Sequence, residues 1–519
     1  MKPRTLLVLT VVVAALAAFV WFYERKLPTS EEAKAEEKKV LAGVKADAVR
    51  EVSIVRGGTT VRIVREGKPP AEEEKKASDD EENAMPSSTS DWRLASPLQA
   101  RADRSAVEGL LSNVLGLEMA RTLEKVDRKE YGLAPPAALV TVVTADGKRT
   151  LEVGRELPGT DQRAVAVAGE AAVHAVTSSF WSDLTKPPGD WRSRELFAGT
   201  RDDVERVSLQ TGGNRIVLAR RGDEPWLEAP IADRADRERF DELVDALTTL
   251  NATEFVDQPP ASATELGLEP PQTVVEVVRK GQAKPLIPRP PGGPGGRSTT
   301  SGLADGSPLW FRLELGAPKA EPATAPTPSD SSGGGETAKT STRYARADGQ
   351  LVTINASALF ESVARPPQEW RSRGWTTFAV YDVDKIEVKD GHGALTLTRD
   401  EGDWKRGKDK IFYGTVSDFL AAVTDAKAEK LLDASTAAGL AAGPPALTIT
   451  LTGSGGKSQT LTLWPGRVEG PAGPGAPARS SGRDVVLLMP AALPADLAEK
   501  LTAIRKAEPL KEATPTPAP

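Results

Sequence analysis

Alternating hydrophobic and polar positions recur in three separate stretches of the chain. Alternation with a period of two is typical of half-buried β-strands, and in each stretch two such runs precede a tryptophan. These runs and tryptophans are Val49–Val55, Val61–Val64 and Trp92; Val204–Leu209, Arg215–Leu218 and Trp226; and Asp384–Val388, Ala394–Leu397 and Trp404. We therefore predict two strands and a tryptophan-bearing third strand in each stretch.

A helical pattern follows each tryptophan. Its apolar residues recur at i, i+3, i+4 and i+7, which places them on one face of a helix. They are Val107, Leu110, Leu111 and Val114; Phe240, Leu243, Val244 and Leu247; and Val416, Phe419, Leu420 and Val423. Asp103 and Asp236 precede the first two helices and are the expected N-caps. In the third helix the expected N-cap is Thr415 or Ser417.

A Gly-Leu turn signal closes each helical stretch, and paired prolines follow it. The glycines are Gly132, Gly267 and Gly439, which lie 40, 41 and 35 residues after the tryptophans. Further strand-like runs come next: Leu139–Val143 and Leu151–Gly154; Thr273–Val278 and Leu313–Gly316; Leu447–Leu451 and Leu461–Leu463, with a last strand near Val165, Leu351 and Val485. This order predicts three diverged repeats of an α+β fold, each with a mainly antiparallel sheet and one main helix.

Low-complexity segments and a shared motif mark the borders of the repeats. The first two repeats close on the same four residues, Trp191–Arg194 and Trp370–Arg373. Segments rich in Pro, Gly or Ser predict disordered insertions at about 285–308 and 317–340, and similar low-complexity material lies at 71–90, 466–482 and 513–519. The predicted domains are an anchor at 1–26, a charged tether at 27–46, repeats at 47–200, 201–380 and 381–508, and a disordered Pro-rich tail at 509–519.

The N-terminus carries an uncharged apolar run, Thr5–Tyr23. Its length is close to the roughly 20 residues that a membrane-spanning helix needs. The run is preceded by Lys2 and Arg4, so the positive-inside rule places the N-terminus in the cytoplasm and the rest of the chain in the periplasm. The expected membrane-interface residues are Trp21, Phe22, Tyr23, Arg25 and Lys26. A cleaved signal peptide, with Ala15–Ala17 as the cleavage site, is the alternative.

Composition removes several classes of function. With 67 Lys and Arg against 73 Asp and Glu, the net charge of −6 gives no basic field for nucleic acid. The chain has no Cys, which excludes disulfides, thiolate nucleophiles and Cys-ligated metals. Of its two His, His392 lies between two glycines and is expected in a turn, and His174 lacks a partner at ligand spacing. We therefore expect no enzyme, no catalytic residues, no cofactor and no metal site.

The repeated tryptophans and glycines also have a structural reading. Trp92, Trp226 and Trp404 would serve either as contacts between sheet and helix or as an aromatic binding platform, and we expect core contacts. The three glycines of the Gly-Leu turns are expected to adopt positive φ. All six residues are therefore interpreted as structural positions of the repeat.

With the anchor, the tryptophan-bearing strand, the Asp-led helix, the Tyr131–Leu133 turn and the Leu151–Gly154 strand, the chain resembles an uncharacterised bacterial family, domain of unknown function 4340. Members tend to be encoded beside ABC-type transport systems similar to the one associated with gliding motility. The resemblance implies an accessory subunit of such a system, with the permease and auxiliary subunits as partners, and it implies no catalytic residues.

Three functional hypotheses follow. The first is a non-enzymatic, single-pass inner-membrane protein whose periplasmic repeats scaffold or regulate an ABC-type transporter, with membrane lipid as its other partner. The second is a periplasmic module that binds glycan or peptidoglycan, for which exposed aromatic side chains would serve as platforms and cell-wall contact would follow. The third is a carboxylate-dependent hydrolase of the envelope, which needs two acids that converge in a cleft.

Overall fold

The computed structural model describes residues 36–66, 92–123, 126–280, 310–319, 342–433, 437, 439–440, 443–466, 468–470 and 473–510. It divides into two compact units, with the boundary between Arg194 and Glu195. The predicted anchor with its interface residues Trp21, Phe22, Tyr23, Arg25 and Lys26 lies outside the described residues, as do 71–90, 285–308, 320–340 and 513–519. None of the helices in the described ranges combines the length and apolar character that a membrane span needs.

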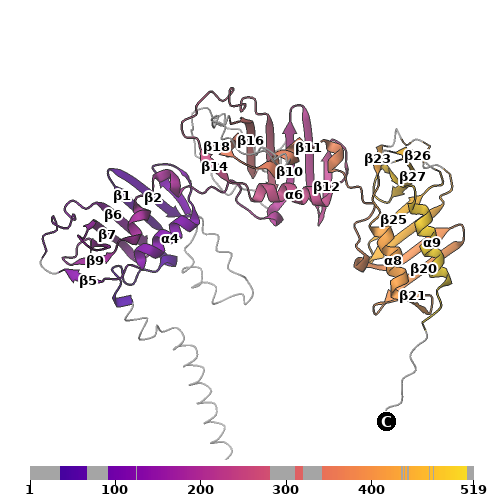
Figure 1. Cartoon of the computed structure of the whole chain (residues 1–519), viewed down its shortest axis with the longest axis horizontal. Coiled ribbons are helices and arrows are strands. Elements are labelled where there is room, and N and C mark those ends of the chain that lie inside the picture. Colours follow the sequence, from indigo (N-terminus) through magenta and orange to yellow (C-terminus); the bar gives the residue numbers. More distant parts are fainter. Residues whose placement is uncertain are drawn as a thin grey trace, which may run out of the picture. The chain divides into compact units, whose positions relative to one another are not determined.

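Three antiparallel sheets form the body of the chain, the first in one unit and the other two in the second unit (Figure 1). Their strand orders are β4-β3-β2-β1-β6-β7-β8-β9-β5, β13-β12-β11-β10-β15-β16-β17-β18-β14 and β22-β21-β20-β19-β24-β25-β27-β28-β23, with β26 paired to β27. The three paths are the same. The internal repeat is therefore confirmed, and the fold is mainly β because the helices are few.

The strands of the first sheet are β1 (Glu51–Arg56), β2 (Thr59–Arg65), β3 (Trp92–Ser96), β4 (Ala100–Arg101), β5 (Arg121–Leu123), β6 (Ala138–Thr144), β7 (Gly147–Glu156), β8 (Gln162–Val167) and β9 (Val173–Thr177). Those of the second are β10 (Val204–Thr211), β11 (Asn214–Arg221), β12 (Glu224–Ala229), β13 (Asp233–Arg234), β14 (Ala252–Phe255), β15 (Thr273–Arg279), β16 (Phe311–Pro318), β17 (Arg343–Ala347) and β18 (Gln350–Ile354). The third has β19 (Val383–Asp390), β20 (Gly393–Asp400), β21 (Asp403–Arg406), β22 (Asp409–Ile411), β23 (Lys430–Asp433), β24 (Leu447–Gly453), β25 (Ser458–Leu463), β26 (Val468–Gly470), β27 (Gly473–Ser480) and β28 (Val485–Pro490).

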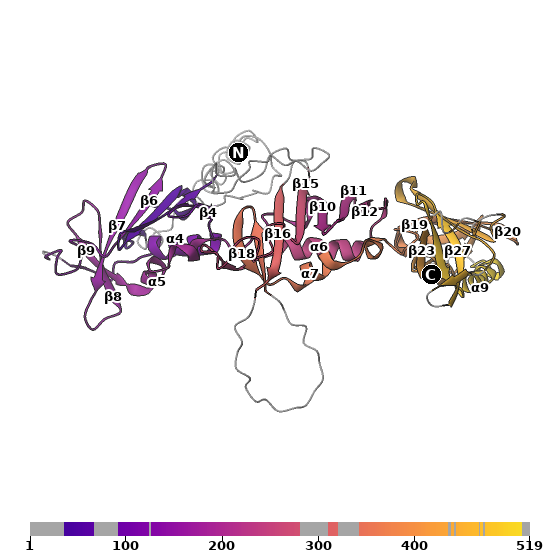
Figure 2. The ribbon, with the colours of Figure 1, turned by 90° about the horizontal axis from the view of Figure 1, so that it is seen from above.

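The main helix of each repeat is α4 (Arg104–Leu115), α6 (Arg237–Thr248) or α8 (Tyr413–Thr424). Each buries the four apolar residues that the sequence predicts. Shorter or later helices are α5 (Trp181–Leu184), α7 (Ser357–Ala364) and α9 (Leu493–Lys506). Figure 2 shows α7 beside α6, and Figure 1 shows α9 beside α8, so each sheet in the second unit has two helices packed together.

The N-caps differ between the repeats. Asp103 accepts a hydrogen bond from the backbone N–H of Ala106, and Asp236 accepts one from Arg239, which confirms both predicted caps. The third helix begins at Tyr413, so Phe412 takes the N-cap position and neither Thr415 nor Ser417 does. The expectation for the third helix was wrong because the helical period fixes the buried face but not the first residue.

The first hairpin gives a common register for the three repeats. Its two-residue turn is Gly57-Gly58, Gly212-Gly213 or Gly391-His392, as shown by the pairs Arg56–Thr59, Thr211–Asn214 and Asp390–Gly393. The position of His392 in this turn agrees with the sequence prediction. Counted from the turn, Arg65, Arg220 and Arg399 are equivalent, and their cross-strand partners are Trp92, Pro225 and Trp404.

Trp226 is therefore not in register with the other two tryptophans. It pairs with Ala219, one position away from Pro225, and a shift of one residue turns a side chain to the opposite face of the sheet. Trp92 and Trp404 are buried in the cores between sheet and helix, while Trp226 is half-buried. Trp226 carries the guanidinium of Arg221 4.5 Å from its ring centroid instead.

Several strands escape the sequence pattern. The edge strands β4 and β13 have two residues each, too few to show alternation. Segment 466–482, interpreted above as low-complexity material, contains β26 and β27, and β27 forms the ladder between β25 and β28. The many prolines and glycines of this segment do not show the alternation of a strand, although β27 is bonded through its backbone to β25 and β28.

The glycines of the Gly-Leu turns adopt positive φ in all three repeats. The values are 68° at Gly132, 69° at Gly267 and 89° at Gly439. At Gly132 and Gly267 a Cβ would also lie 3.0 and 2.9 Å from the backbone nitrogens of Arg155 and Ala317. These two turns thus need glycine for its conformation and for the close approach of a strand.

Candidate functional site

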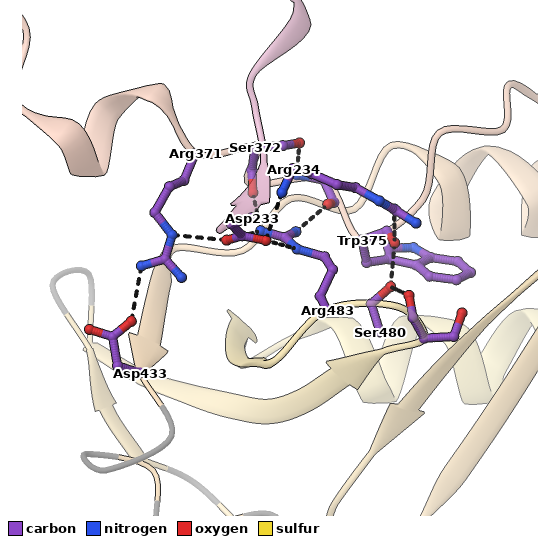
Figure 3. Close-up of polar contacts among 10 residues, drawn as sticks. Asp233, Arg234, Arg371, Ser372, Trp375, Asp433, Ser480 and Arg483 are labelled. Carbon is purple, nitrogen blue, oxygen red and sulfur yellow. Dashed lines mark hydrogen bonds and ion pairs between the residues drawn. The ribbon is translucent and has the colours of Figure 1, made fainter. Parts of the chain in front are cut away.

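A buried ionic cluster joins the second and third repeats inside the second unit (Figure 3). Its centre is Asp233, on the short edge strand β13. Arg371 comes from the Trp-Arg-Ser-Arg motif that links the two repeats, and Arg483 from the turn between β27 and β28. The exposed fractions of these three side chains are 1%, 3% and 0%.

Both carboxylate oxygens of Asp233 are fully used. Arg483 donates to Oδ1 from Nε at 2.8 Å and to Oδ2 from Nη2 at 2.9 Å. Arg371 Nε donates to Oδ2 at 2.9 Å, and the backbone N–H of Arg234 donates to Oδ1 at 2.8 Å. The contact with Arg483 is the two-pronged arrangement that suits a planar guanidinium and a carboxylate.

The remaining donors of Arg483 hold the linking segment. Arg483 donates from Nη1 to the carbonyl of Gly374 and from Nη2 to that of Ser372, each at 2.8 Å. Arg371 also pairs through Nη1 with Asp433, an exposed carboxylate at the end of β23, at 3.1 Å. One arginine of the third repeat therefore binds the second repeat and the connection between them at once.

Trp375 continues this arrangement into the core of the third repeat. Its buried indole donates from Nε1 to the carbonyl of Val423, at the end of α8, at 2.6 Å. Its own carbonyl accepts from Arg234 Nη1 at 3.0 Å and from Ser480 Oγ at 2.6 Å. The linking segment is thus bonded to both repeats along its length, as Figure 3 shows.

Electrostatics keep the central carboxylate ionised. Burial acts to raise the pKa of Asp233, but the hydrogen bonds and charge of Arg483, followed by those of Arg371, outweigh it and hold the pKa below its ordinary value. Burial lowers the pKa of Arg234 in the same cluster. A carboxylate with a lowered pKa and both oxygens occupied is suited to joining elements rather than to proton transfer.

The first repeat has the same linking motif with a different residue at the centre. The backbone N–H of the N-cap donates to the carbonyl of the motif tryptophan in both repeats, from Asp103 to Trp191 and from Asp236 to Trp370. Register in the edge strands makes Ala100 the equivalent of Asp233. The first repeat therefore lacks a carboxylate at this position, and the third repeat has the exposed Asp409 there.

An arginine in the first hairpin forms a second recurring contact. Arg65, Arg220 and Arg399 each donate to a carbonyl of the short 3-10 turn that precedes the first strand, namely those of Ala46, Arg201 and Tyr381, at 3.2, 3.4 and 3.1 Å. These turns are η2 (Ala46–Ala48), η5 (Arg201–Asp203) and η7 (Val380–Asp382), and each lies against the main helix of its repeat.

In the third repeat this turn and helix carry exposed aromatic side chains. Tyr381 is 76% exposed, Phe412 60% and Tyr413 45%. We call these three residues the aromatic patch. In the corresponding turn of the second repeat, Arg201 forms ion pairs with Asp241 and Asp245 of α6 at 3.3 and 2.9 Å.

The family comparison bears directly on these features. The model of one family, described as "Domain of unknown function (DUF4340)", matches residues 92–275 and 331–443, more than half of the chain. The chain belongs to the DUF4340 family. Neither a curated protein nor a solved structure matches it. The matched ranges include Asp233, Arg371 and the aromatic patch, but stop before Arg483.

Elsewhere in this DUF4340 protein, His174 and the tryptophans that the structure describes lie in the packed interior or are partly covered by it. Among the described residues all tryptophans are buried or half-buried, so the exposed aromatic side chains are tyrosine and phenylalanine. His174 lies on β9, nearly buried, with Nδ1 3.1 Å from Thr122 Oγ1. Burial lowers the pKa of this histidine, which keeps it neutral at neutral pH.

The second repeat also has a hollow of about 320 Å³. It is lined by the end of α6 with the following strand, and by the start of α7. The lining side chains are aliphatic, hydroxyl or amide groups, for example Thr249, Asn251 and Ser357. Across the described part of the chain, no group of three or more acidic or histidine side chains could hold a metal ion.

Sequence reasoning did not find the ionic cluster or the aromatic patch. Arg371 lies in the motif shared by two repeats, which was the one available signal for the cluster. Arg483 is separated from Asp233 by 250 residues, and no local pattern connects them. Phe412 was detectable only by noting that the position before the third helix lacks the aspartate of the other two.

Proposed function

We propose that this DUF4340 protein is a non-enzymatic scaffold, anchored in the inner membrane, whose periplasmic repeats serve as an accessory subunit of an ABC-type transport system. The observation that carries the scaffold role is the ionic cluster of Asp233, Arg371 and Arg483. It makes the second and third repeats a single bonded body, which suits a protein that holds partners at fixed positions.

Burial of the charged side chains of the cluster costs free energy, and this cost suggests that the cluster serves to hold the junction in place. Removing charged side chains from water costs several kcal/mol per ion, and hydrophobic packing of similar volume often stabilises a protein as well or better. What ionic groups add is directional bonding: Arg483 fixes the angle at which its turn meets Asp233 and the carbonyl of Ser372. We infer that this junction was selected for its geometry.

The transport partner and the membrane anchor rest on the family resemblance and on the apolar N-terminal run. The test is affinity purification of the tagged full-length protein from cells in mild detergent, with quantitative mass spectrometry of what is recovered. Two variants accompany it. One lacks residues 1–23, and the other is Asp233→Asn, which keeps the shape of the central side chain and removes its charge.

The expected result is recovery of the permease and auxiliary subunits of an ABC-type transporter with the full-length chain. Recovery should fall in the variant that lacks residues 1–23, because the anchor places the scaffold beside the permease. It should also fall with Asp233→Asn, because the junction loses its central charge. Glu108→Gln, which removes one member of an exposed ion pair on α4, is the matched control and should recover the same subunits as the wild type. Recovery of the full-length chain without any transporter subunit would refute the proposal.

A further inference from the structure

The aromatic patch of the third repeat departs from its counterparts in a way that points to a ligand. The position before the main helix is aspartate in the first two repeats, where it caps the helix, and Phe412 in the third. Replacing a capping residue by an apolar one weakens a helix. A stable helix usually has a polar N-cap, and a large apolar side chain is usually buried. Phe412 departs from both rules, and residues that do so tend to be functional.

The ring of Phe412 has a defined support. A Cβ at Gly414 would lie 2.6 Å from Phe412 Cε1 and 3.3 Å from two further ring atoms. The ring therefore lies directly on the backbone of Gly414, in the first turn of α8. Alanine is otherwise a better helix former than glycine, so Gly414 sacrifices helix stability and leaves room for the ring.

Tyr381 lies at the same end of the sheet as Phe412. It lies in η7, which packs against α8, and its carbonyl accepts from Arg399, which pairs with Trp404 on the next strand. Trp404 in turn pairs with Ile411, the residue before Phe412. Phe412 and Tyr413 thus lie at the end of the edge strand β22, and Tyr381 lies two strands away, beside the end of β20.

Residues 507–510 contact the hairpin of β21 and β22. Arg406, at the turn between β21 and β22, donates to the carbonyl of Ala507 at 3.2 Å. Three residues later, the N–H of Leu510 donates to the carbonyl of Lys410 at 2.9 Å. Leu510 therefore lies beside β22 at Lys410, two residues before Phe412.

The residues that follow have the composition that aromatic surfaces bind. Segment 511–519 reads KEATPTPAP, with Pro515, Pro517 and Pro519, and lies outside the described residues. Proline-rich segments favour the extended polyproline II conformation and dock on surfaces lined by aromatic side chains. At about 3.1 Å per residue nine residues reach about 28 Å, whereas Phe412 is only about 7 Å beyond Lys410 at about 3.3 Å per strand residue.

We propose that the aromatic patch of Tyr381, Phe412 and Tyr413 is a docking surface for the proline-rich segment 511–519 of the same chain. The segment starts next to the patch, so the cost of bringing the two together is small. A tether of this length gives an effective concentration in the millimolar range. A contact with a dissociation constant of about 1 mM is then occupied about half of the time, which slows exchange of the covered amides about twofold.

The test is hydrogen–deuterium exchange with mass spectrometry on the purified full-length protein in detergent. It compares the wild-type chain with a version that ends at Leu510. Peptides that cover 379–383 and 409–417 are expected to exchange about twofold faster in the shortened version. The N-terminal turn of α6 in the second repeat, which has the aspartate cap, serves as the internal control and should exchange at the same rate in both.

Two variants separate docking from a general loss of structure. Phe412→Asp restores the cap of the other repeats and removes the ring, so it should keep the helix while abolishing the difference between the full and shortened chains. Gly414→Ala strengthens the helix but displaces the ring, and should reduce the difference. A synthetic peptide of residues 509–519 added to the shortened version should restore slow exchange, and the same peptide with its prolines replaced by glycine should not.

Equal exchange in the full and shortened chains would overturn the proposal. A difference that persists in Phe412→Asp would also overturn it, because the aromatic ring would then play no part. If a soluble oligomer of N-acetylglucosamine protects the patch and the peptide does not, the patch is a glycan platform and the proposal is wrong. None of these outcomes bears on the scaffold role, which is tested by recovery of partners.

Discussion

Replacing Asp233 by alanine should destabilise the second unit strongly, because it leaves Arg371 and Arg483 buried without their shared counter-charge. The side chains of all three residues are at most 3% exposed. Removing one partner of a buried ion pair costs about 3–5 kcal/mol, since an uncompensated charge remains in the interior. The exposed carboxylate of Asp433 stays beside Arg371, which favours the lower half of this range.

The measurement is urea unfolding of the full-length chain followed by tryptophan fluorescence, to which Trp375 beside the cluster contributes. Glu108→Ala is the matched control: it removes one member of an ion pair on α4 whose side chains are both 50% exposed, and pairs of this kind contribute about 0.3–0.5 kcal/mol. Arg483→Met, alone and combined with Asp233→Ala, completes a double-mutant cycle.

The cycle is expected to be strongly non-additive. Loss of Arg483 alone leaves Asp233 with Arg371 as its remaining charged partner. Loss of both Asp233 and Arg483 removes a buried arginine together with its counter-charge. The double variant should therefore be less destabilised than the sum of the two single variants. If Asp233→Ala costs no more than Glu108→Ala, the cluster does not hold the junction and the argument fails.

Four further predictions follow from the structure. The difference in unfolding free energy between wild type and Asp233→Asn should be constant above about pH 4, the ordinary range for an aspartate. It should shrink as the pH falls through the lowered pKa of Asp233. Urea unfolding at about pH 3 to 7 measures this difference, and a difference that grows toward low pH contradicts the prediction. Asp236→Ala should destabilise the second repeat by about 1 kcal/mol through loss of the cap on α6, whereas Phe412→Asp should stabilise the third repeat by a similar amount. If thermal unfolding shows that both variants change the stability in the same direction, the capping argument is refuted. Gly316→Ala should cost more than about 2 kcal/mol, because its Cβ would lie 2.3 Å from the carbonyl oxygen of Leu266. Gly109→Ala is its control: no heavy atom of the described residues lies within 4 Å of that Cβ, so the exchange should stabilise α4 by about 0.5–1 kcal/mol, and destabilisation there would count against the packing argument.

The sequence predicts the repeat and its helices well because each depends on local periodicity. The spacing of Val107, Leu110, Leu111 and Val114 identifies the buried face of α4, and the same spacing recurs in the other two repeats. Asp103 is predictable as a cap for the same reason: it acts on a backbone N–H three residues away.

The parts that sequence reasoning missed depend on distant residues or on neighbouring strands. The two residues of β13 belong to the sheet because they pair with Trp226 and Leu227, and too short a strand shows no alternation. Trp226 lies opposite Ala219, one register position away from the place that Trp92 and Trp404 occupy in their sheets, and a count of tryptophans cannot detect this difference. Asp233 and Arg483 meet only after two repeats have folded.

The central position of the first strand in each sheet has a mechanical consequence. In the first repeat β1 is bonded to β2 on one side and to β6 on the other, and β10 and β19 are flanked in the same way. A tension that enters a repeat through this strand cannot peel it from an edge, as it could peel β4 or β22. Both ladders have to break together before this strand can leave its sheet. A pull on the N-terminal side of a repeat therefore acts on a strand that is bonded along both of its edges.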